Sequence, residues 1–264
     1  MEEIRAESWS HLHELLFAGS WHERLRRHRS DFAYRGEAST AAKLVTSLQR
    51  LGGDFGDVER HLLRNFRKYA PRSAVPEDSL WHWLALAKHH RPATHLLDST
   101  FSPYVALHFA TAHPADYEHD GFVWMVDFVK ANRLLPEPLR EALEREGMNA
   151  VSAELLHELA PTLGAFDGLG EDVVVFFEPP ALDERIVNQY ALFSLMPSPH
   201  ARMDTWLEAR PELARRVILP AELKWEVRDK LDQANITERV LFPGLDGLAT
   251  WLKRYFSPRS DGSS

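Results

Sequence analysis

The sequence predicts a protein of the α+β class. Apolar residues at helical spacings of three and four dominate the first half of the 264-residue chain, and segments rich in β-branched and aromatic residues dominate the second half. Helices and strands do not alternate as βαβ units require, and the sequence holds neither an internal repeat nor a glycine-rich phosphate loop. We therefore expect a single domain over residues 1–256, with a helical N-terminal half and helical insertions between the later strands.

The bulk composition excludes several classes of function. Lys and Arg number 31 against 39 Asp and Glu, so the formal charge of −8 creates no overall field that would attract nucleic acid or anionic lipid. The absence of cysteine rules out disulfides, thiolate metal ligands and cysteine nucleophiles. No apolar stretch resembles a secretory signal or a membrane span, so we expect a cytoplasmic protein with no membrane partner.

Helices alternate with two short strands in the first half. Apolar residues on one face predict a helix over residues 8–17, with Ser8 as its cap. The segment DFAYRGEAS, residues 31–39, suits a brief strand that runs into a loop at Gly36 and places Arg35 at the strand end. Further helices are expected at residues 40–52, 57–70, 79–90 and 103–112, with a buried strand at 93–100.

Strand-forming segments are concentrated in the second half. Their β-branched and aromatic residues predict strands at residues 121–129, 171–179, 189–195 and 215–220. A helical insertion is expected at residues 135–164, and two helices near the C-terminus at 223–236 and 245–256. Residues 1–30 form a helical lead-in to the domain, and residues 257–264 have the composition of a flexible tail.

The densest basic run is RLRRHR at residues 24–29. On a helix such a run is usually a solvated face. Next to a pocket around Arg35, it could instead hold the phosphates of a nucleic-acid target. The sequence leaves both interpretations open.

Histidines gather in the middle of the chain, but their spacing does not define a metal site. The cluster contains neither an H-E-x-x-H helix nor a closed set of ligands, so we expect no metal. Its members are His82, His89, His90, His95 and His108.

Four segments of the chain form an ordered set of motifs: YRGE at 34–37, LALAKHHRPATHLLDSTFSPYVALHFA at 84–110, ERIVNQYALF at 184–193 and LFPGLDGLATWL at 241–252. Together they resemble the FRG domain family, which is named after its Phe-Arg-Gly motif. The sequence departs from the family pattern in the second and third segments. Lys88, Arg91, His95 and Ser99 stand where the family commonly has Gln, Gly, Arg and Trp, and Ala191 stands where glycine is usual.

The order of these motifs also resembles, more weakly, the ADP-ribosyltransferase fold with its split β-sheet core and bound NAD. This resemblance implies that Arg35, beside Gly36, grips an anionic oxygen of NAD, and that Ser99 and Thr100 orient the nicotinamide ribose. Gln189 would hold the ribose 2′-hydroxyl. Tyr104, His90 or Trp83 is expected to offer a ring face on which nicotinamide stacks. Because the amide of Gln189 carries no negative charge, Glu37 or Glu184 is expected to supply it.

Two functions follow from the resemblance. The first is an NAD-dependent ADP-ribosyltransferase that uses Arg35, Gln189 and Glu37 to modify DNA, RNA or protein, as a bacterial toxin or phage-defence effector with an antitoxin or other regulatory partner. The second is a non-catalytic module whose pocket binds a nucleotide or a protein partner.

Structural roles remain open for the same residues. Arg35 could pair with Asp98 in a buried ion pair, and Asp98 could be a structural acceptor. His89 and His90 could cap the C-terminus of their helix. Trp81 and Trp83, at alternate positions, favour one buried and one exposed ring.

Overall fold

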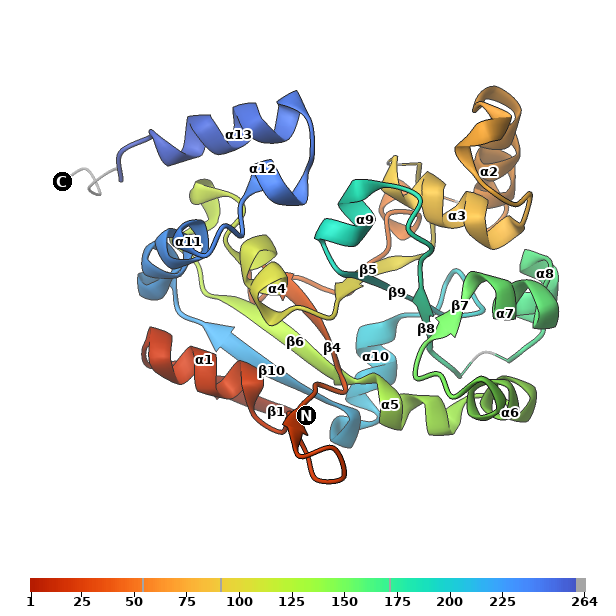
Figure 1. Ribbon diagram of the computed structural model, residues 1–264, viewed down its shortest axis with the longest axis horizontal. Coiled ribbons are helices and arrows are strands. Elements are labelled where there is room, and N and C mark those ends of the chain that lie inside the picture. The colour runs from red at the N-terminus through yellow and green to blue at the C-terminus, as the bar shows by residue number, and fades with distance from the viewer. Residues whose placement is uncertain (54, 91, 171, 260–264) are drawn as a thin grey trace.

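The computed structural model describes residues 1–53, 55–90, 92–170 and 172–259. Within these residues, eight strands form one mixed sheet in the order β1-β10-β6-β4-β5-β9-β8-β7, and β2 and β3 form a separate hairpin (Figure 1). The strands are β1 (Glu2–Arg5), β2 (Trp21–His22), β3 (Arg27–His28), β4 (Phe32–Glu37), β5 (Leu97–Thr100), β6 (Gly121–Asp127), β7 (Val151–Ser152), β8 (Val175–Glu178), β9 (Ala191–Leu195) and β10 (Ala214–Leu219).

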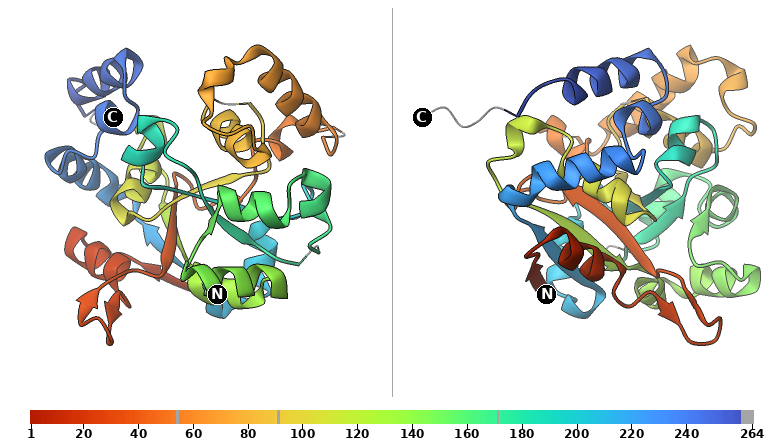
Figure 2. Two further views of the ribbon diagram at one scale, coloured as in Figure 1. Left: turned by 45° about the vertical axis from the view of Figure 1, so that its right-hand side comes forward. Right: turned by 60° about the vertical axis from the view of Figure 1, so that its left-hand side comes forward.

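Helices surround this sheet on both faces (Figure 2). The longer ones are α1 (Trp9–Phe17), α2 (Val58–Tyr69), α3 (Leu80–His89), α4 (Pro103–Ala110), α6 (Glu137–Glu146), α7 (Ala153–Leu159), α11 (Lys224–Gln233) and α13 (Leu245–Tyr255). Some of the longer helices pack on the strands, as α4 does on β4, and others pack on neighbouring helices, as α2 does on α3. Short helices are α5 (Phe128–Ala131), α8 (Leu163–Asp167), α9 (Glu184–Asn188), α10 (Met203–Glu208) and α12 (Glu238–Leu241).

Strand β6 is buried along its whole length because both faces of the sheet are covered. Val123 and Met125 point to the side covered by α1, α4 and α11. Phe122 and Trp124 point to the opposite side, where α5 and α10 pack. This alternation explains why the segment is a continuous apolar run in the sequence.

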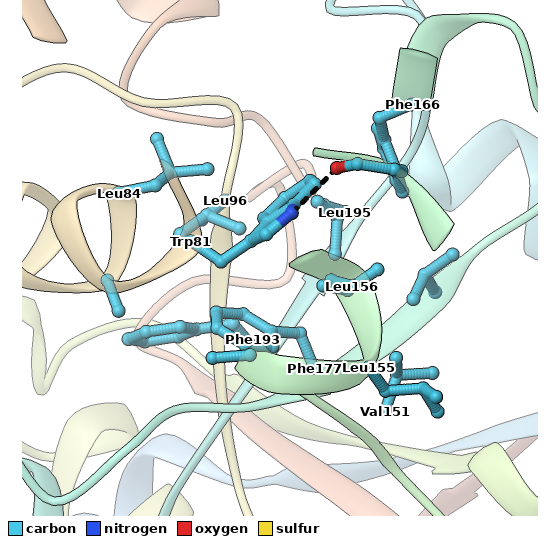
Figure 3. Close-up of a cluster of buried hydrophobic side chains, with 14 of the residues drawn as sticks. Trp81, Leu84, Leu96, Val151, Leu155, Leu156, Phe166, Phe177, Phe193 and Leu195 are labelled. Carbon is cyan, nitrogen blue, oxygen red and sulfur yellow. Dashed lines mark hydrogen bonds between the residues drawn. The ribbon is translucent and has the colours of Figure 1, made fainter. Parts of the chain in front are cut away.

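A second apolar cluster lies between β8, β9 and the helices α3, α6 and α7. Trp81 is completely buried in it, and its indole Nε1 donates a hydrogen bond to the carbonyl oxygen of Ala160 at 2.9 Å (Figure 3). Trp83 is also buried, at 3% exposure, and donates to Asp78. The expectation of one buried and one exposed ring was therefore wrong, because α3 packs against neighbours on most of its circumference.

The sheet is nearly divided between β4 and β5. Strand β4 pairs with β6 over six residues, but it meets β5 at one pair, Tyr34 and Thr100. Beyond that pair the two strands diverge. The eight strands nevertheless form one hydrogen-bonded sheet with a seam between β4 and β5, so the expected ADP-ribosyltransferase-like split core is not confirmed.

Most predicted elements are confirmed, and three predictions were wrong. Residues 40–52 form no α-helix, since only Gln49–Leu51 make a 3₁₀ turn. The basic run forms part of the hairpin and not a helix. The expected helical lead-in, residues 1–30, contains β1 and this hairpin beside α1, so it is less helical than expected.

Three expectations fall partly on residues that lie outside the described ones. They concern Arg91, the first residue of the strand expected at 171–179, and the last five positions of the tail, 260–264. Residues 257–259 are exposed. In the part of the chain that the structure describes, none of the helices has the length and apolar character needed to cross a membrane.

Candidate functional site

A cavity of ≈ 530 Å³ opens where β4 and β5 diverge. Its wall comes from these two strands, the end of α3, the turn after α4, helix α9 and the start of β9. A volume of this size is within the range of small-molecule sites. The predicted site residues that line it are Arg35, Gly36, Glu37, Ser99, Thr100 and Gln189.

Arg35 bridges the seam. Its Nε donates to Glu37 Oε1 at 2.7 Å, and its Nη1 donates to the backbone carbonyl oxygen of Asp98 at 2.5 Å. The guanidinium thus links β4 to β5 beyond the last backbone pair. The expected ion pair between Arg35 and Asp98 is replaced by this contact with the carbonyl group.

Gly36 has a packing role that needs no ligand. A Cβ atom at this position would lie 1.7 Å from the carbonyl oxygen of Ala106 and 2.9 Å from the nitrogen of Ala110. Helix α4 therefore rests directly on the backbone of β4, and only glycine leaves room for it. Gly36 itself lines the cavity, together with Phe109 of α4 and with Ala112 and His113 after it.

Asp98 presents its carboxylate to the cavity. Lys88 Nζ lies 2.7 Å from Asp98 Oδ2, and the two side chains are 11% and 55% exposed. Burial among the cavity walls by itself raises the pKa of Asp98, but the charges of Lys88 and Arg35 outweigh it and hold the pKa below its ordinary value. The group is therefore ionised at neutral pH. The Asp98 side chain is surrounded by the residues of the cavity wall, but it keeps a solvent-accessible surface that faces the cavity.

Thr100 and Gln189 are engaged in internal hydrogen bonds. The Thr100 hydroxyl donates to the backbone carbonyl of Gln189 at 2.7 Å and accepts from the amide of Ser102 at 3.0 Å. The Gln189 side-chain nitrogen donates to the carbonyl oxygen of Leu241 at 2.9 Å. Asn188 does the same to Val240 at 2.8 Å. Helix α9 thereby holds the backbone of α12.

His90 and Tyr104 do not line the cavity. The ring of His90 faces Phe66 of α2 with their centroids 6.4 Å apart. The Tyr104 hydroxyl is bonded to His13 Nδ1 at 2.8 Å, and its ring stacks on Trp9 at 6.1 Å. These two residues are therefore not placed to stack on a ligand in the cavity.

His89 lines the cavity in place of His90, because successive helical residues point about 100° apart. Its Nε2 lies 3.1 Å from Asp183 Oδ1. Burial and the neighbouring charge of Arg185 lower the pKa of His89, so the ring is neutral at pH 7 despite this carboxylate. From the pair HH alone, the sequence could not indicate which ring turns inward.

The electrostatic character of the cavity is cationic. Among the described lining residues, four carry a fixed positive charge and two a negative one, although the whole chain is acidic. Sequence reasoning missed Arg50 and Arg185, although Arg185 is the arginine of the quoted R-I motif. The cations are Arg35, Arg50, Lys88 and Arg185, and the acids are Glu37 and Asp98.

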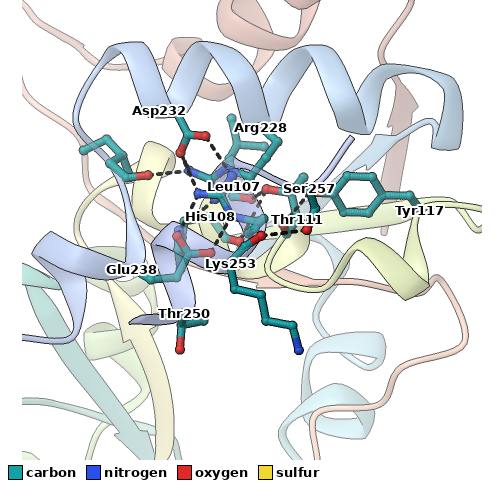
Figure 4. A network of polar contacts seen from close by, with 12 residues as sticks. Leu107, His108, Thr111, Tyr117, Arg228, Asp232, Glu238, Thr250, Lys253 and Ser257 are labelled. Atoms are coloured by element: carbon teal, nitrogen blue, oxygen red, sulfur yellow. Dashed lines mark hydrogen bonds and ion pairs between the residues drawn. The ribbon is translucent and has the colours of Figure 1, made fainter. Parts of the chain in front are cut away.

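A buried charge network, formed by His108, Arg228, Asp232, Glu238 and Arg254, anchors the segment that Gln189 contacts (Figure 4). Arg254 donates to Glu238 and to Asp232 at 2.6 to 2.7 Å. Arg228, with no exposed surface, donates to His108 Nδ1 at 2.8 Å. Burial and the two arginines lower the pKa of His108 to about 3. Two cations and two anions therefore balance around a neutral imidazole.

A second cavity of ≈ 610 Å³ lies between α2 and residues 157–164. Two of its arginines, Arg60 and Arg67, are paired with Asp167 and Asp78. None of the predicted site residues lines it. No group of three His, Asp or Glu side chains that could hold a metal occurs among the described residues, and the cysteine-free sequence offers no thiolate.

Residues 30–119 match the model of the FRG domain. The match begins just before β4 and ends just before β6, so it includes the seam, α3 and α4. This part of the chain is thus similar to the FRG domain. Arg185 and Gln189 of the cavity lie beyond the matched range. The chain matches no curated protein and no solved structure.

Proposed function

We propose that the cavity at the seam binds NAD and that the protein transfers ADP-ribose from it to a macromolecular acceptor. The observation that carries this proposal is the convergence of four fixed cations on one cavity of ≈ 530 Å³ in a chain of formal charge −8. Such a cavity favours a ligand that brings several negative charges, as a dinucleotide does through its pyrophosphate.

The residues present suit such a ligand. Arg35 and Arg185 are planar, permanently charged donors that fit phosphate oxygens, and Lys88 adds a compact charge. Ser99 supplies a hydroxyl at the same wall. The neutral ring of His89 offers an aromatic surface there, which the predicted His90 and Tyr104 do not.

The transfer would break the bond between nicotinamide and ribose C1′ and form a bond from an acceptor nucleophile to the same carbon. Positive charge develops on the ribose as the first bond breaks. Glu37 and Asp98 are the carboxylates in the cavity that could stabilise this charge, and Glu37 could take the proton of the nucleophile. Glu184 is exposed and does not line the cavity.

A second candidate is supported by Gln189. Its side-chain amide donates to the carbonyl oxygen of Leu241, which suits a structural clamp better than a catalytic group. On this reading the FRG domain binds a nucleotide without turning it over and signals occupancy through α12. The toxin or phage-defence setting and a protein antitoxin belong to the first candidate only.

Calorimetric titration with NAD tests the binding step. We expect saturable binding, weakened at least about tenfold by Arg35→Ala or Arg185→Ala, since each removes a charged hydrogen bond worth about 1.5 kcal/mol or more. Arg64→Ala, an exposed arginine on α2, is the matched control and should bind as the unmodified protein does. No binding at millimolar NAD would refute the proposal.

Turnover separates the two candidates. Protein incubated with labelled NAD and mixed nucleic acids or lysate should release nicotinamide and label an acceptor if it is a transferase, and Glu37→Gln should reduce the release more than the binding. Saturable NAD binding without release from any acceptor would favour the module.

A further inference from the structure

The hairpin β2–β3 carries the basic run of the sequence and projects from the body of the molecule (Figure 2). Trp21 pairs with His28 and His22 with Arg27, and residues 23–26 form the tip. None of its residues lines the cavity at the seam. The proposed function therefore leaves this surface without a role.

Arginines of the hairpin are free of acidic partners. Arg24, Arg26, Arg27 and Arg29 are all exposed, and among the described residues no carboxylate lies within ion-pair distance of any of them. Many other arginines of the chain, such as Arg254, are paired. The tip also carries one carboxylate, that of Glu23, which accepts a hydrogen bond from Trp21 Nε1 at 2.9 Å. Four arginines against this one acid make a concentrated positive surface in a chain with more acids than bases.

The hairpin is preformed. The Arg29 amide donates to the Ser20 carbonyl at 2.5 Å, and the Leu25 amide donates to His22 Nδ1 at 3.3 Å. Arg26 adopts a left-handed backbone with φ of 50°, where glycine or asparagine would be less strained. Because the backbone of the tip is already ordered, little further conformational entropy is lost when it binds a ligand.

Two exposed apolar side chains accompany the arginines. Trp21 is 47% exposed and stands edge-on to His28 at 5.1 Å, while Leu25 at the tip is 49% exposed. Arginines interleaved with an exposed aromatic ring are the pattern with which proteins hold single-stranded nucleic acid. The guanidinium groups contact phosphates, and the ring stacks on a base.

We infer that the hairpin β2–β3 binds single-stranded nucleic acid, with Arg24, Arg26 and Arg27 on the phosphates and Trp21 on a base. An anionic membrane fits less well, because its extended surface would also face the remainder of the protein, which carries more acids than bases. A strand is narrow and touches the hairpin alone. This inference concerns binding only and does not depend on NAD.

Fluorescence anisotropy with labelled single-stranded RNA and DNA oligonucleotides over a salt series tests the inference. The triple variant Arg24→Gln, Arg26→Gln, Arg27→Gln should lower the slope of log affinity against log salt by about two, since each lost phosphate contact removes about 0.7. Trp21→Ala should weaken binding at least fivefold with the slope unchanged, and Trp21→Phe should restore most of it.

Controls make each outcome decisive. The triple variant Arg64→Gln, Arg72→Gln, Arg140→Gln removes the same charge from exposed positions elsewhere and should bind as the unmodified protein does. Circular dichroism establishes that both triple variants are folded, and NAD titration of each separates this inference from the proposed function. A preference for RNA or DNA identifies the natural strand. Equal losses in both triples, no oligonucleotide binding at low salt, or binding only to duplex or to anionic vesicles would overturn the inference.

Discussion

Gly36 is the residue on which the packing of α4 against the sheet most directly depends. Gly36→Ala should lower the free energy of unfolding by about 3 kcal/mol, because the added methyl group meets backbone atoms of α4 that cannot rotate away. Urea denaturation followed by circular dichroism measures this loss.

The matched control is Gly164→Ala. Gly164 lies in α8 and has nothing within 4 Å of an added Cβ. Because alanine is the better helix former, this variant should be neutral or more stable by up to about 1 kcal/mol. Equal stability of the two variants would contradict the close packing.

His108 should make the free energy of unfolding depend on pH. The pKa of the folded ring is about 3, below its ordinary value of 6.5, so the unfolded chain binds the extra proton between these values. Stability should therefore be complete above pH 6.5 and decline as the pH falls toward 3. His108→Gln keeps an acceptor for Arg228 and should flatten this decline.

Denaturant titrations between pH 5 and 7.5 measure the effect, which we expect to reach about 2 kcal/mol at pH 5. Glu238 and Asp98, whose pKa values are lowered, add to the loss only below about pH 4.5. An identical slope in the His108→Gln variant would assign the decline to other groups.

At the scale of elements, much of the fold follows from local signals. The Ser8 cap and the apolar stripe identify α1, and the run of β-branched and aromatic residues identifies β6. The prediction of a helix at residues 40–52 was wrong because an irregular segment can bury leucines at helical spacing. Leu44 and Leu48 are buried here, while Leu51 is 55% exposed. Periodicity alone cannot distinguish such a segment from a helix.

The candidate site was only partly predictable. Motifs indicated Arg35, Ser99 and Gln189, which meet at the cavity. Local sequence could not reveal that β4 and β5 separate after one pair, since a seam is a property of two distant strands. For the same reason the inward turn of His89 and the arrival of Arg185 from α9 became visible only in the structure.

Helices α12 and α13 depend on the buried charge network. Arg254→Met should cost about 3 to 5 kcal/mol, because it leaves Glu238 and Asp232 buried with one cation fewer. Hydrogen exchange should increase first in α12 and α13. The double variant Arg254→Met, Glu238→Gln restores the balance of charge and should recover part of the loss.

At the scale of the whole molecule, the seam divides the sheet into two well-paired halves. Backbone amides of β4 and β5 next to the cavity should exchange faster than those between β4 and β6, where six pairs are formed. A ligand that contacts both strands should slow the first set and leave the second unchanged. Hydrogen exchange with and without NAD measures this, and uniform protection would contradict a ligand at the seam.

The clamp between Gln189 and Leu241 also has a consequence for biosynthesis. A nascent chain contains the strands within residues 30–119 early in synthesis. The cavity wall that carries Gln189 is held by α12, however, and α12 is held in turn by Arg254. Nascent chains that have not yet reached Arg254 would therefore lack a completed cavity. Whatever the cavity does, it cannot begin before this residue has left the ribosome.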